Sequence, residues 1–195
     1  SKLCKADLVT SVVKEFSELQ GIMGREYISR QSGDAAIADA VCEHYMPRFA
    51  GDSLPSTPLG AVLAIADKMD TLVGYFAIGL IPSGSADPFA LRRQALGIIQ
   101  IHRQWKVQVS INELARQAYR LHSVSGKLKF DEEKTVCEVV NFVNGRLKML
   151  LEEAGVEHDI IDAAISVPST FPAKIMSVAK VLTGMHRDQR FEEFV

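Results

Sequence analysis

The sequence predicts an all-α protein, because apolar residues recur at helical spacing along most of the chain. Polar capping residues stand where these patterns begin, as at Ser110, and proline or glycine stands where they end, as at Pro47 and Gly155. The alternation typical of a strand fits only short runs. We therefore expect a helical bundle over residues 1–123 and a smaller helical region over residues 124–195.

The first apolar pattern extends from Leu8 to Tyr27, and Gly21 and Gly24 interrupt it. It predicts a helix over residues 6–20 and a second helix, or a kinked continuation, to Ser29.

The next helix is expected over residues 35–46. Asp34 supplies its N-cap, Pro47 ends it, and His44 lies in its last turn. Two prolines in residues 47–55 predict a loop that exposes Arg48.

The stretch over residues 59–105 predicts two apolar helices joined by a loop rich in Pro, Gly and Ser. The second helix should begin at Asp87-Pro88, because aspartate favours the N-cap and proline favours the first helical position.

The first of these two central helices has two contrasting sides at about 100° per residue. The apolar side carries Val62, Ile65, Met69, Leu72, Val73 and Phe76. The opposite side carries Gly60, Asp67, Asp70, Thr71 and Gly74. Two carboxylates one turn apart on such a face need a metal, an arginine or several donors. This face is therefore either a site or a buried salt bridge.

The remaining helices follow from local caps. Ser110 to Glu113 forms a capping box ahead of a helix over residues 111–122. Asp131 caps a long helix that ends before Gly155. Shorter helices are expected over residues 158–166 and 173–183, and residues 123–129 are the expected subdomain boundary.

Composition excludes several classes of protein. Lys and Arg total 22 against 24 Asp and Glu, so any attraction to nucleic acid or anionic membrane must come from a local patch. No apolar run reaches the roughly 20 residues of a membrane-spanning helix. Cys4, Cys42 and Cys137 are odd in number and far apart, which favours a reducing compartment and core positions. The common nucleotide, zinc and hydrolase motifs are absent.

The strongest candidate for chemistry is Asp7, His44 and Asp67, one on each of three early helices. Such ligands are able to hold a divalent metal on a bundle axis. Each also has a structural interpretation. Asp7 is suited to cap the first helix, the helix dipole favours His44 where it stands, and Asp67 is suited to pair with an arginine.

Four long blocks, in order along most of the chain, carry a family resemblance. They are CKADLVTSVVKEFSELQGIMGREY, EHYMPRFAGDSLP, LAIADKMDTLVGYFAIGLIPSGSADPFALRRQALGIIQI and NFVNGRLKMLLEE. These blocks resemble the β subunit of the bacterial and organellar glycyl-tRNA synthetase of α2β2 type.

The resemblance implies a ligase that joins glycine to its tRNA at the expense of ATP, in the cytoplasm or in a plant organelle. It implies an α subunit that holds the aminoacylation site, ATP and Mg, and a β subunit that binds tRNA and the α subunit. No cofactor is implied for this chain, which would be an HD-like helical domain followed by linker helices. The family's anticodon-binding domain would begin near Phe191.

HD phosphohydrolases, to which this region is similar in fold, use a His, a His-Asp doublet and a later Asp as metal ligands. Here the doublet position reads Ala6-Asp7, Asp67 matches the later Asp, and His44 is an extra candidate. The missing histidine implies a degenerate, non-catalytic site. The alternatives are an active phosphohydrolase that uses Asp7, His44 and Asp67, and a purely structural spacer.

The positive residues that are candidates for tRNA binding are scattered, and each alone also fits a solvated surface charge. In the first half they are Arg25, Arg30, Arg48, Arg93 and Arg103, and in the second half Lys127, Lys129, Arg146 and Lys148. Arg92 falls on the apolar side of its helix, so we expect it to be largely buried and bonded to Asp67 or Asp70. Arg93 should be exposed.

Overall fold

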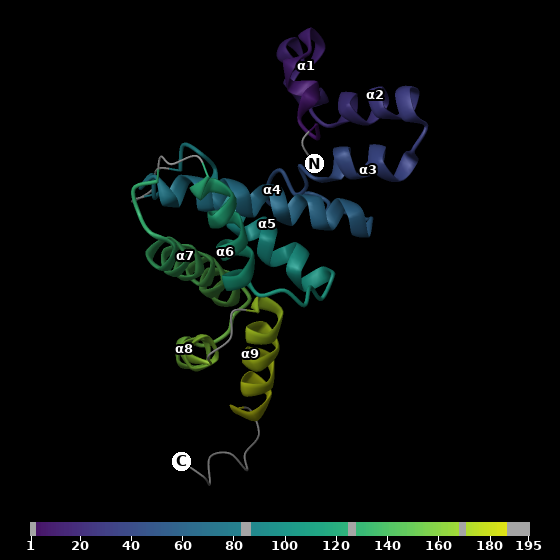
Figure 1. Cartoon of the computed structure of the whole chain (residues 1–195). Coiled ribbons are helices and arrows are strands. Elements are labelled where there is room, and N and C mark those ends of the chain that lie inside the picture. Colours follow the sequence, from purple (N-terminus) through teal and green to yellow (C-terminus); the bar gives the residue numbers. More distant parts are fainter. Residues whose placement is uncertain (1–2, 83–86, 125–127, 168–170, 187–195) are drawn as a thin grey trace.

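The computed structural model describes residues 3–82, 87–124, 128–167 and 171–186, and within these ranges it contains helices and no strand (Figure 1). This confirms the predicted all-α class. The N-terminal elements are η1 (Ala6–Val9), α1 (Ser11–Glu15), η2 (Ser17–Leu19), α2 (Ile22–Ser32) and α3 (Ala35–Glu43). The others are α4 (Pro58–Ala77), α5 (Leu91–Gln104), α6 (Ile111–Ser123), α7 (Glu132–Glu153), α8 (His158–Ser166) and α9 (Pro172–His186).

The helix expected over residues 6–20 was wrong, because three short helical pieces take its place. The Thr10 hydroxyl donates to the Asp7 carbonyl at 2.6 Å and accepts from the Val13 amide at 3.4 Å, so a new helix begins after it. Gly21, at φ +80°, then turns the chain into α2. Polar groups near the backbone therefore override the apolar periodicity in this segment.

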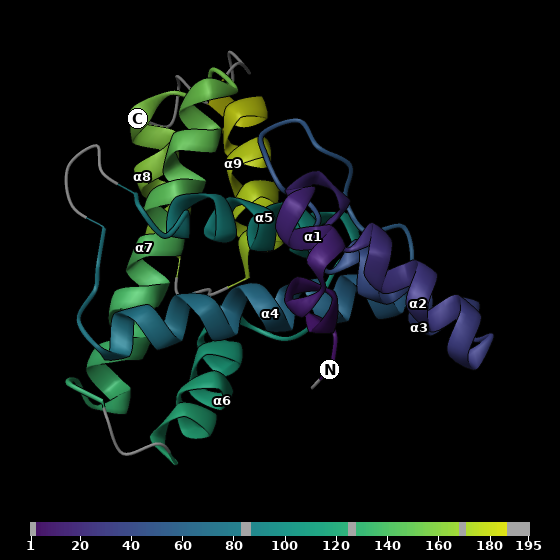
Figure 2. The ribbon, with the colours of Figure 1, turned by 90° about the horizontal axis from the view of Figure 1, so that it is seen from above.

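Helix α3 begins where the sequence predicts and ends earlier. The Asp34 carboxylate accepts from the Ile37 amide at 3.1 Å, which confirms the predicted cap. The helix ends at Glu43 rather than at residue 46, so His44 occupies its C-cap. Figure 2 shows the α2–α3 hairpin beside α4, on the side away from α7 and α8.

Helix α5 begins at Leu91, three residues after the predicted start at Pro88. Ala90, at φ 56°, takes the N-cap position. The Asp87 carboxylate still caps the helix, because its two oxygens accept from the Leu91 amide at 2.8 Å and the Arg92 amide at 3.0 Å. The capping residue was therefore predicted correctly, but the predicted first residue of the helix was wrong.

The largest hydrophobic core contains buried residues from all of the helices α4, α5, α6, α7, α8 and α9. The predicted apolar side of α4 is buried in the cores except for Val62, which is 67% exposed and corrects that expectation. Because α6 and α7 contribute to the same core, packing is continuous across residue 123, and the boundary expected there stays a prediction. Cys137 is exposed and Cys4 and Cys42 are half-buried, so the expected core positions of the cysteines were wrong.

The predicted caps of α6 and α7 are confirmed. The Ser110 hydroxyl accepts from the Glu113 amide at 3.1 Å, and the Asp131 carboxylate accepts from the Lys134 amide at 2.8 Å. Gly155 follows α7 at φ +77°, as a C′ glycine does. Helix α8 has the predicted bounds.

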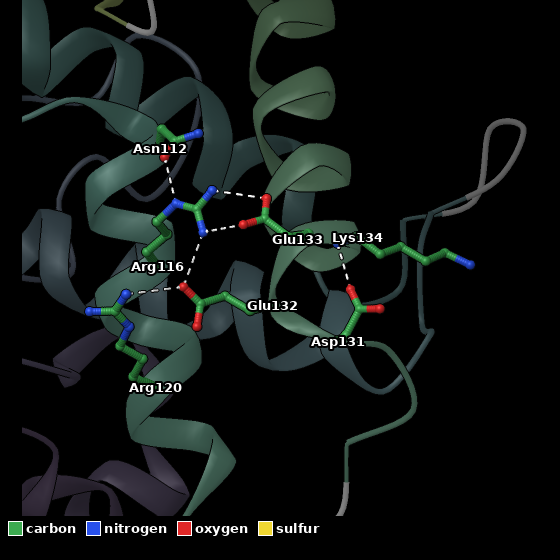
Figure 3. A network of polar contacts seen from close by, with 7 residues as sticks. All are labelled: Asn112, Arg116, Arg120, Asp131, Glu132, Glu133 and Lys134. Atoms are coloured by element: carbon green, nitrogen blue, oxygen red, sulfur yellow. Dashed lines mark hydrogen bonds and ion pairs between the residues drawn. The ribbon is translucent and has the colours of Figure 1, made fainter.

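An ion-pair network joins α6 to α7 (Figure 3). The Arg116 guanidinium donates to Glu133 at 2.8 and 2.9 Å and to Glu132 at 3.1 Å. Its hydrogen bonds lower the pKa of Glu133. Because the network is open to water, it contributes less to stability than the core beneath it.

The helices that the structure describes include none with both the length and the hydropathy needed to cross a membrane.

Candidate functional site

The three candidates for a degenerate HD-type metal site lie where the N-terminal elements meet α4. Asp7 comes from η1, His44 follows α3, and Asp67 lies in α4. Each has partners of its own, which determine what the arrangement can do.

Asp7 is buried, with 2% of its surface exposed. One carboxylate oxygen accepts from the Gly21 amide at 2.6 Å, and the other accepts from the Tyr45 hydroxyl at 3.4 Å. Gly24 lies so close that an added Cβ would be 3.4 Å from the Asp7 carboxyl carbon. Asp7 therefore stabilises the Gly21 turn and does not cap the first helix, which corrects that alternative.

His44 is fully buried, and its Nδ1 lies 2.6 Å from the Val41 carbonyl oxygen. Because a carbonyl accepts, Nδ1 carries the proton. Burial lowers the pKa of His44, so the ring is neutral at pH 7. Its Nε2 has no hydrogen-bond partner within the described part of the chain. A buried nitrogen without a partner is costly, and Nε2 is the one buried side-chain atom of the three candidates that the described structure leaves unsatisfied.

Asp67 pairs with a lysine rather than with an arginine. The Lys5 ammonium lies 2.7 Å from its Oδ1, and the Asp67 side chain is 19% exposed. Lys68, beside it in α4, is buried and donates to the His44 carbonyl at 3.1 Å. Burial lowers the pKa of Lys68 to about 8. The Lys5 ammonium therefore lies next to this carboxylate, and the charge of Asp67 partly offsets the effect of burial on the pKa of Lys68.

The residues present do not fit an HD-type metal. The Asp7 carboxylate faces an amide and a hydroxyl, and the Asp67 carboxylate faces the Lys5 ammonium. Across the described ranges, no group of three or more His, Cys, Asp and Glu side chains is placed to hold a metal ion. The Lys5–Asp67 pair instead fastens the N-terminal segment to α4.

The glycines of α4 make room for side chains. Gly60 lies against the Glu43 carboxylate, and Gly74 lies against the His122 ring, 3.1 Å from the position of an added Cβ. His122 Nε2 is also 3.0 Å from the Asp70 carboxylate. The groups that approach these two glycines are side chains from α3 and α6, not the backbone of another segment.

Glu43 is the residue that sequence reasoning missed. Its buried carboxylate accepts from the Ser56 amide and hydroxyl at 3.0 and 2.5 Å. It also accepts from the Thr57 amide and hydroxyl at 3.0 and 2.6 Å. The Ser56-Thr57-Pro58 sequence before α4 signals a helix start, but nothing local indicates that a distant carboxylate binds there.

The expected pairing of Arg92 was wrong. Asp67 is bonded to Lys5 and Asp70 to His122, and Arg92 is half-buried rather than largely buried. The reason is that α5 begins later than predicted, so Arg92 lies in its first turn. Arg93 is exposed, as expected.

The four main candidates for RNA contact, Arg25, Arg48, Arg93 and Arg103, are exposed. Burial raises the pKa of the Cys42 thiol, and Arg25 and Arg48 oppose that change, so both lie near Cys42. Arg48 is also held by Asp52, whose carboxylate accepts from its amide at 2.8 Å. Arg103 lines a groove of about 1140 Å³.

The other positive candidates have local roles. Arg30 pairs with Glu26 at 3.6 Å and Lys148 with Asp162 at 2.6 Å. Lys129 lies over Phe130 and Arg146 over Phe142. Lys127 and the expected domain start at Phe191 lie outside the described residues.

Comparisons with known proteins agree with one another. A family model described as glycyl-tRNA synthetase beta subunit matches residues 1–166. The glycine–tRNA ligase beta subunit of Clostridioides difficile is 49% identical over 85% of this chain and 24% of its own length. Those of Syntrophomonas wolfei and Shouchella clausii are each 44% identical, over 99% and 98% of this chain and 28% of their own lengths.

The chain therefore spans about a quarter of the length of the curated relatives it matches. The match covers the N-terminal hairpin, the Lys5–Asp67 contact and the central helices. The chain belongs to the glycyl-tRNA synthetase beta subunit family.

Proposed function

We propose that this chain is a non-catalytic part of a glycine–tRNA ligase β subunit, where it contributes to tRNA recognition and to assembly with an α subunit. In this proposal the α subunit holds the aminoacylation site, ATP and Mg²⁺. The relatives, which are glycine–tRNA ligase beta subunits, support the ligase role, and the exposed arginines support contact with RNA.

The observation that carries the non-catalytic assignment is the Lys5 ammonium, 2.7 Å from the Asp67 carboxylate. A metal-dependent phosphohydrolase needs that carboxylate as a ligand. An ammonium held against it competes directly with a cation. Ala6 also removes the histidine that an HD-type site would use.

The proposed tRNA contacts are Arg25, Arg48, Arg93 and Arg103. Arg48 is the weakest of these, because Asp52 already accepts from it. The net charge of -2 gives no general attraction to RNA, so binding by this chain should be modest and should depend on such local groups.

The test measures binding of fluorescently labelled glycine tRNA to the chain over a series of salt concentrations. We expect weak binding whose affinity falls steeply with salt, because phosphate contacts release counterions. Affinity that is unchanged by salt contradicts the proposed arginine contacts. The complete absence of binding supports a structural spacer instead.

Two controls separate the enzymatic alternatives. The chain mixed with glycine, ATP, Mg²⁺ and tRNA should form no glycyl-tRNA, and formation of it refutes the assignment of the active site to another subunit. Protein prepared without chelator should hold no stoichiometric transition metal. Stoichiometric metal together with phosphate hydrolysis that Asp67→Ala abolishes establishes the phosphohydrolase alternative.

A further inference from the structure

The groove between α5 and α9 has an uneven distribution of charge. Arg103 at the end of α5 and Lys106 in the following loop line one wall, and Lys174 and Lys180 of α9 line the other. The groove has a volume of about 1140 Å³, and the described residues that line it include no aspartate or glutamate. Helix α9 packs against α5 (Figure 1), so both walls belong to the same core.

All four cations are exposed, and within the described ranges none of them forms an ion pair. Six of the other lysines and arginines in the described ranges do have carboxylate partners. Those in ion pairs are Lys5, Arg30, Arg48, Arg116, Arg120 and Lys148. In a chain of net charge -2, four unneutralised cations around one groove create a local positive potential.

The fold holds these charges in a fixed arrangement. Lys174 and Lys180 are separated by six residues of one helix, which is about 9 Å along its axis. Lys106 is in the left-handed region, at φ 47°, and its carbonyl accepts from the Gln108 side chain at 2.7 Å. Positive charges on opposite walls suit a polyanion that lies in the groove, because both walls can neutralise its phosphates.

The hydroxyls in the groove do not compete with this role. Ser177 donates to the Ala173 carbonyl and Thr183 to the Ala179 carbonyl, each at 2.8 Å. Their hydrogens are therefore used within α9, and the side chains of the lining that can donate to a phosphate are the four cations and the amide of Gln108.

We propose that this groove binds the phosphate backbone of the tRNA, through Arg103, Lys106, Lys174 and Lys180. The inference rests on the proposed function, which supplies the RNA, and goes beyond it by assigning the surface. An acidic peptide is the competing occupant, and the test below distinguishes it.

The experiment compares tRNA binding to the wild-type chain and to a variant that carries Arg103→Gln, Lys106→Gln, Lys174→Gln and Lys180→Gln. We expect a loss of affinity of about tenfold or more, and a salt dependence whose slope falls by about one for each cation that contacts a phosphate. A charge-matched pair of double variants adds a control. Lys174→Gln/Lys180→Gln should weaken binding, whereas Lys14→Gln/Lys134→Gln, at exposed lysines outside the groove, should leave it within about twofold.

A second measurement needs no variant. Acetylation of the wild-type chain with and without tRNA should show protection at Lys106, Lys174 and Lys180 and none at Lys14. This readout is independent of any effect of substitutions on folding.

The outcomes separate the two proposals. If wild-type protein binds tRNA and the groove variants bind equally well, or if the control pair weakens binding as much, the groove assignment is overturned and the proposed function stands. If wild-type protein does not bind tRNA, the proposed function fails and the inference fails with it. If polyglutamate binds the groove as tightly as tRNA at the same salt concentration, the occupant is acidic peptide and the RNA assignment is wrong.

Discussion

At the scale of single residues, a buried carboxylate connects the N-terminal hairpin to the start of α4. Glu43 is 8% exposed and accepts four hydrogen bonds from Ser56 and Thr57. Burial raises the pKa of Glu43, but these hydrogen bonds outweigh it, and the pKa lies below its ordinary value of 4.5. The charged form is therefore the one that stabilises this junction.

The first prediction is that Glu43→Gln lowers the free energy of unfolding at pH 7 by about 2 kcal/mol, because hydrogen bonds to a charged acceptor are lost. The folded-state pKa is lowered, so this contribution is present above the ordinary pKa and is lost as pH falls through the lowered value. Urea unfolding of both proteins should show a difference that shrinks below about pH 4.5.

Glu15→Gln, at an exposed position without a described ion pair, is the control and should change stability little at either pH. A Glu43→Gln difference that is constant from pH 7 to acid contradicts the role assigned to the charge.

Side-chain contacts could be predicted from the sequence only where the two partners lie close together in the chain. Caps at Asp34, Ser110 and Asp131 were predictable, because their partners lie three residues away. The pairing of Asp67 with Lys5 was not, because helical periodicity does not specify which distant side chain reaches a carboxylate. The same reason explains the wrong partner proposed for Arg92.

At the scale of elements, replacing a helical glycine with alanine should have opposite effects in α4 and α7. An alanine at Gly60 would clash with the Glu43 carboxylate and lie 2.9 Å from the Thr57 hydroxyl. An alanine at Gly145 meets nothing within 4 Å.

The second prediction follows from this contrast. Gly145→Ala should raise the free energy of unfolding by up to about 1 kcal/mol, because alanine favours a helix interior over glycine. Gly60→Ala should lower it despite the same helical gain, because the Glu43 hydrogen bonds must break or shift. Thermal melts of the two variants beside the wild type measure both effects. A rise in Tm for both variants refutes the close packing of α3 on Gly60.

Element boundaries were predicted best where a cap and an apolar pattern agree. Both signals exist for α6 and α7, and their predicted starts are confirmed. Helix α8 also begins where its apolar pattern predicts, although no described side chain caps it. Before α5 the polar signal was correct, since Asp87 does cap the helix, but the intervening Ala90 turn shifted the first residue. Over residues 6–20 the apolar pattern was misleading, because several of its residues, such as Val9, are exposed.

At the scale of the whole molecule, one core spans the predicted boundary at residue 123. Val73 and Phe76 of α4 share this core with Val139 and Leu147 of α7. The sequence suggested a division there because residues 123–129 lack apolar periodicity. Local composition marks a connection between helices, but it does not show whether the helices on either side share a core.

The third prediction tests this shared core with Leu147→Ala in α7. Leu147 is fully buried, so the variant should lose about 2–5 kcal/mol of stability. Trp105, the single tryptophan, lies at the end of α5, within the region expected before residue 123. Because α5 and α7 share one core, tryptophan fluorescence and far-ultraviolet circular dichroism should report the same lowered midpoint.

Met149→Ala, on the same helix but 42% exposed, is the matched control and should shift the midpoint much less. A Leu147→Ala protein whose dichroism shifts while Trp105 fluorescence keeps the wild-type midpoint requires two independently folding regions. That outcome establishes the division at residue 123, because cavity formation in α7 then leaves α5 intact. Coincident shifts instead place both walls of the α5–α9 groove on one cooperative unit, which keeps Arg103 and Lys180 in fixed relation.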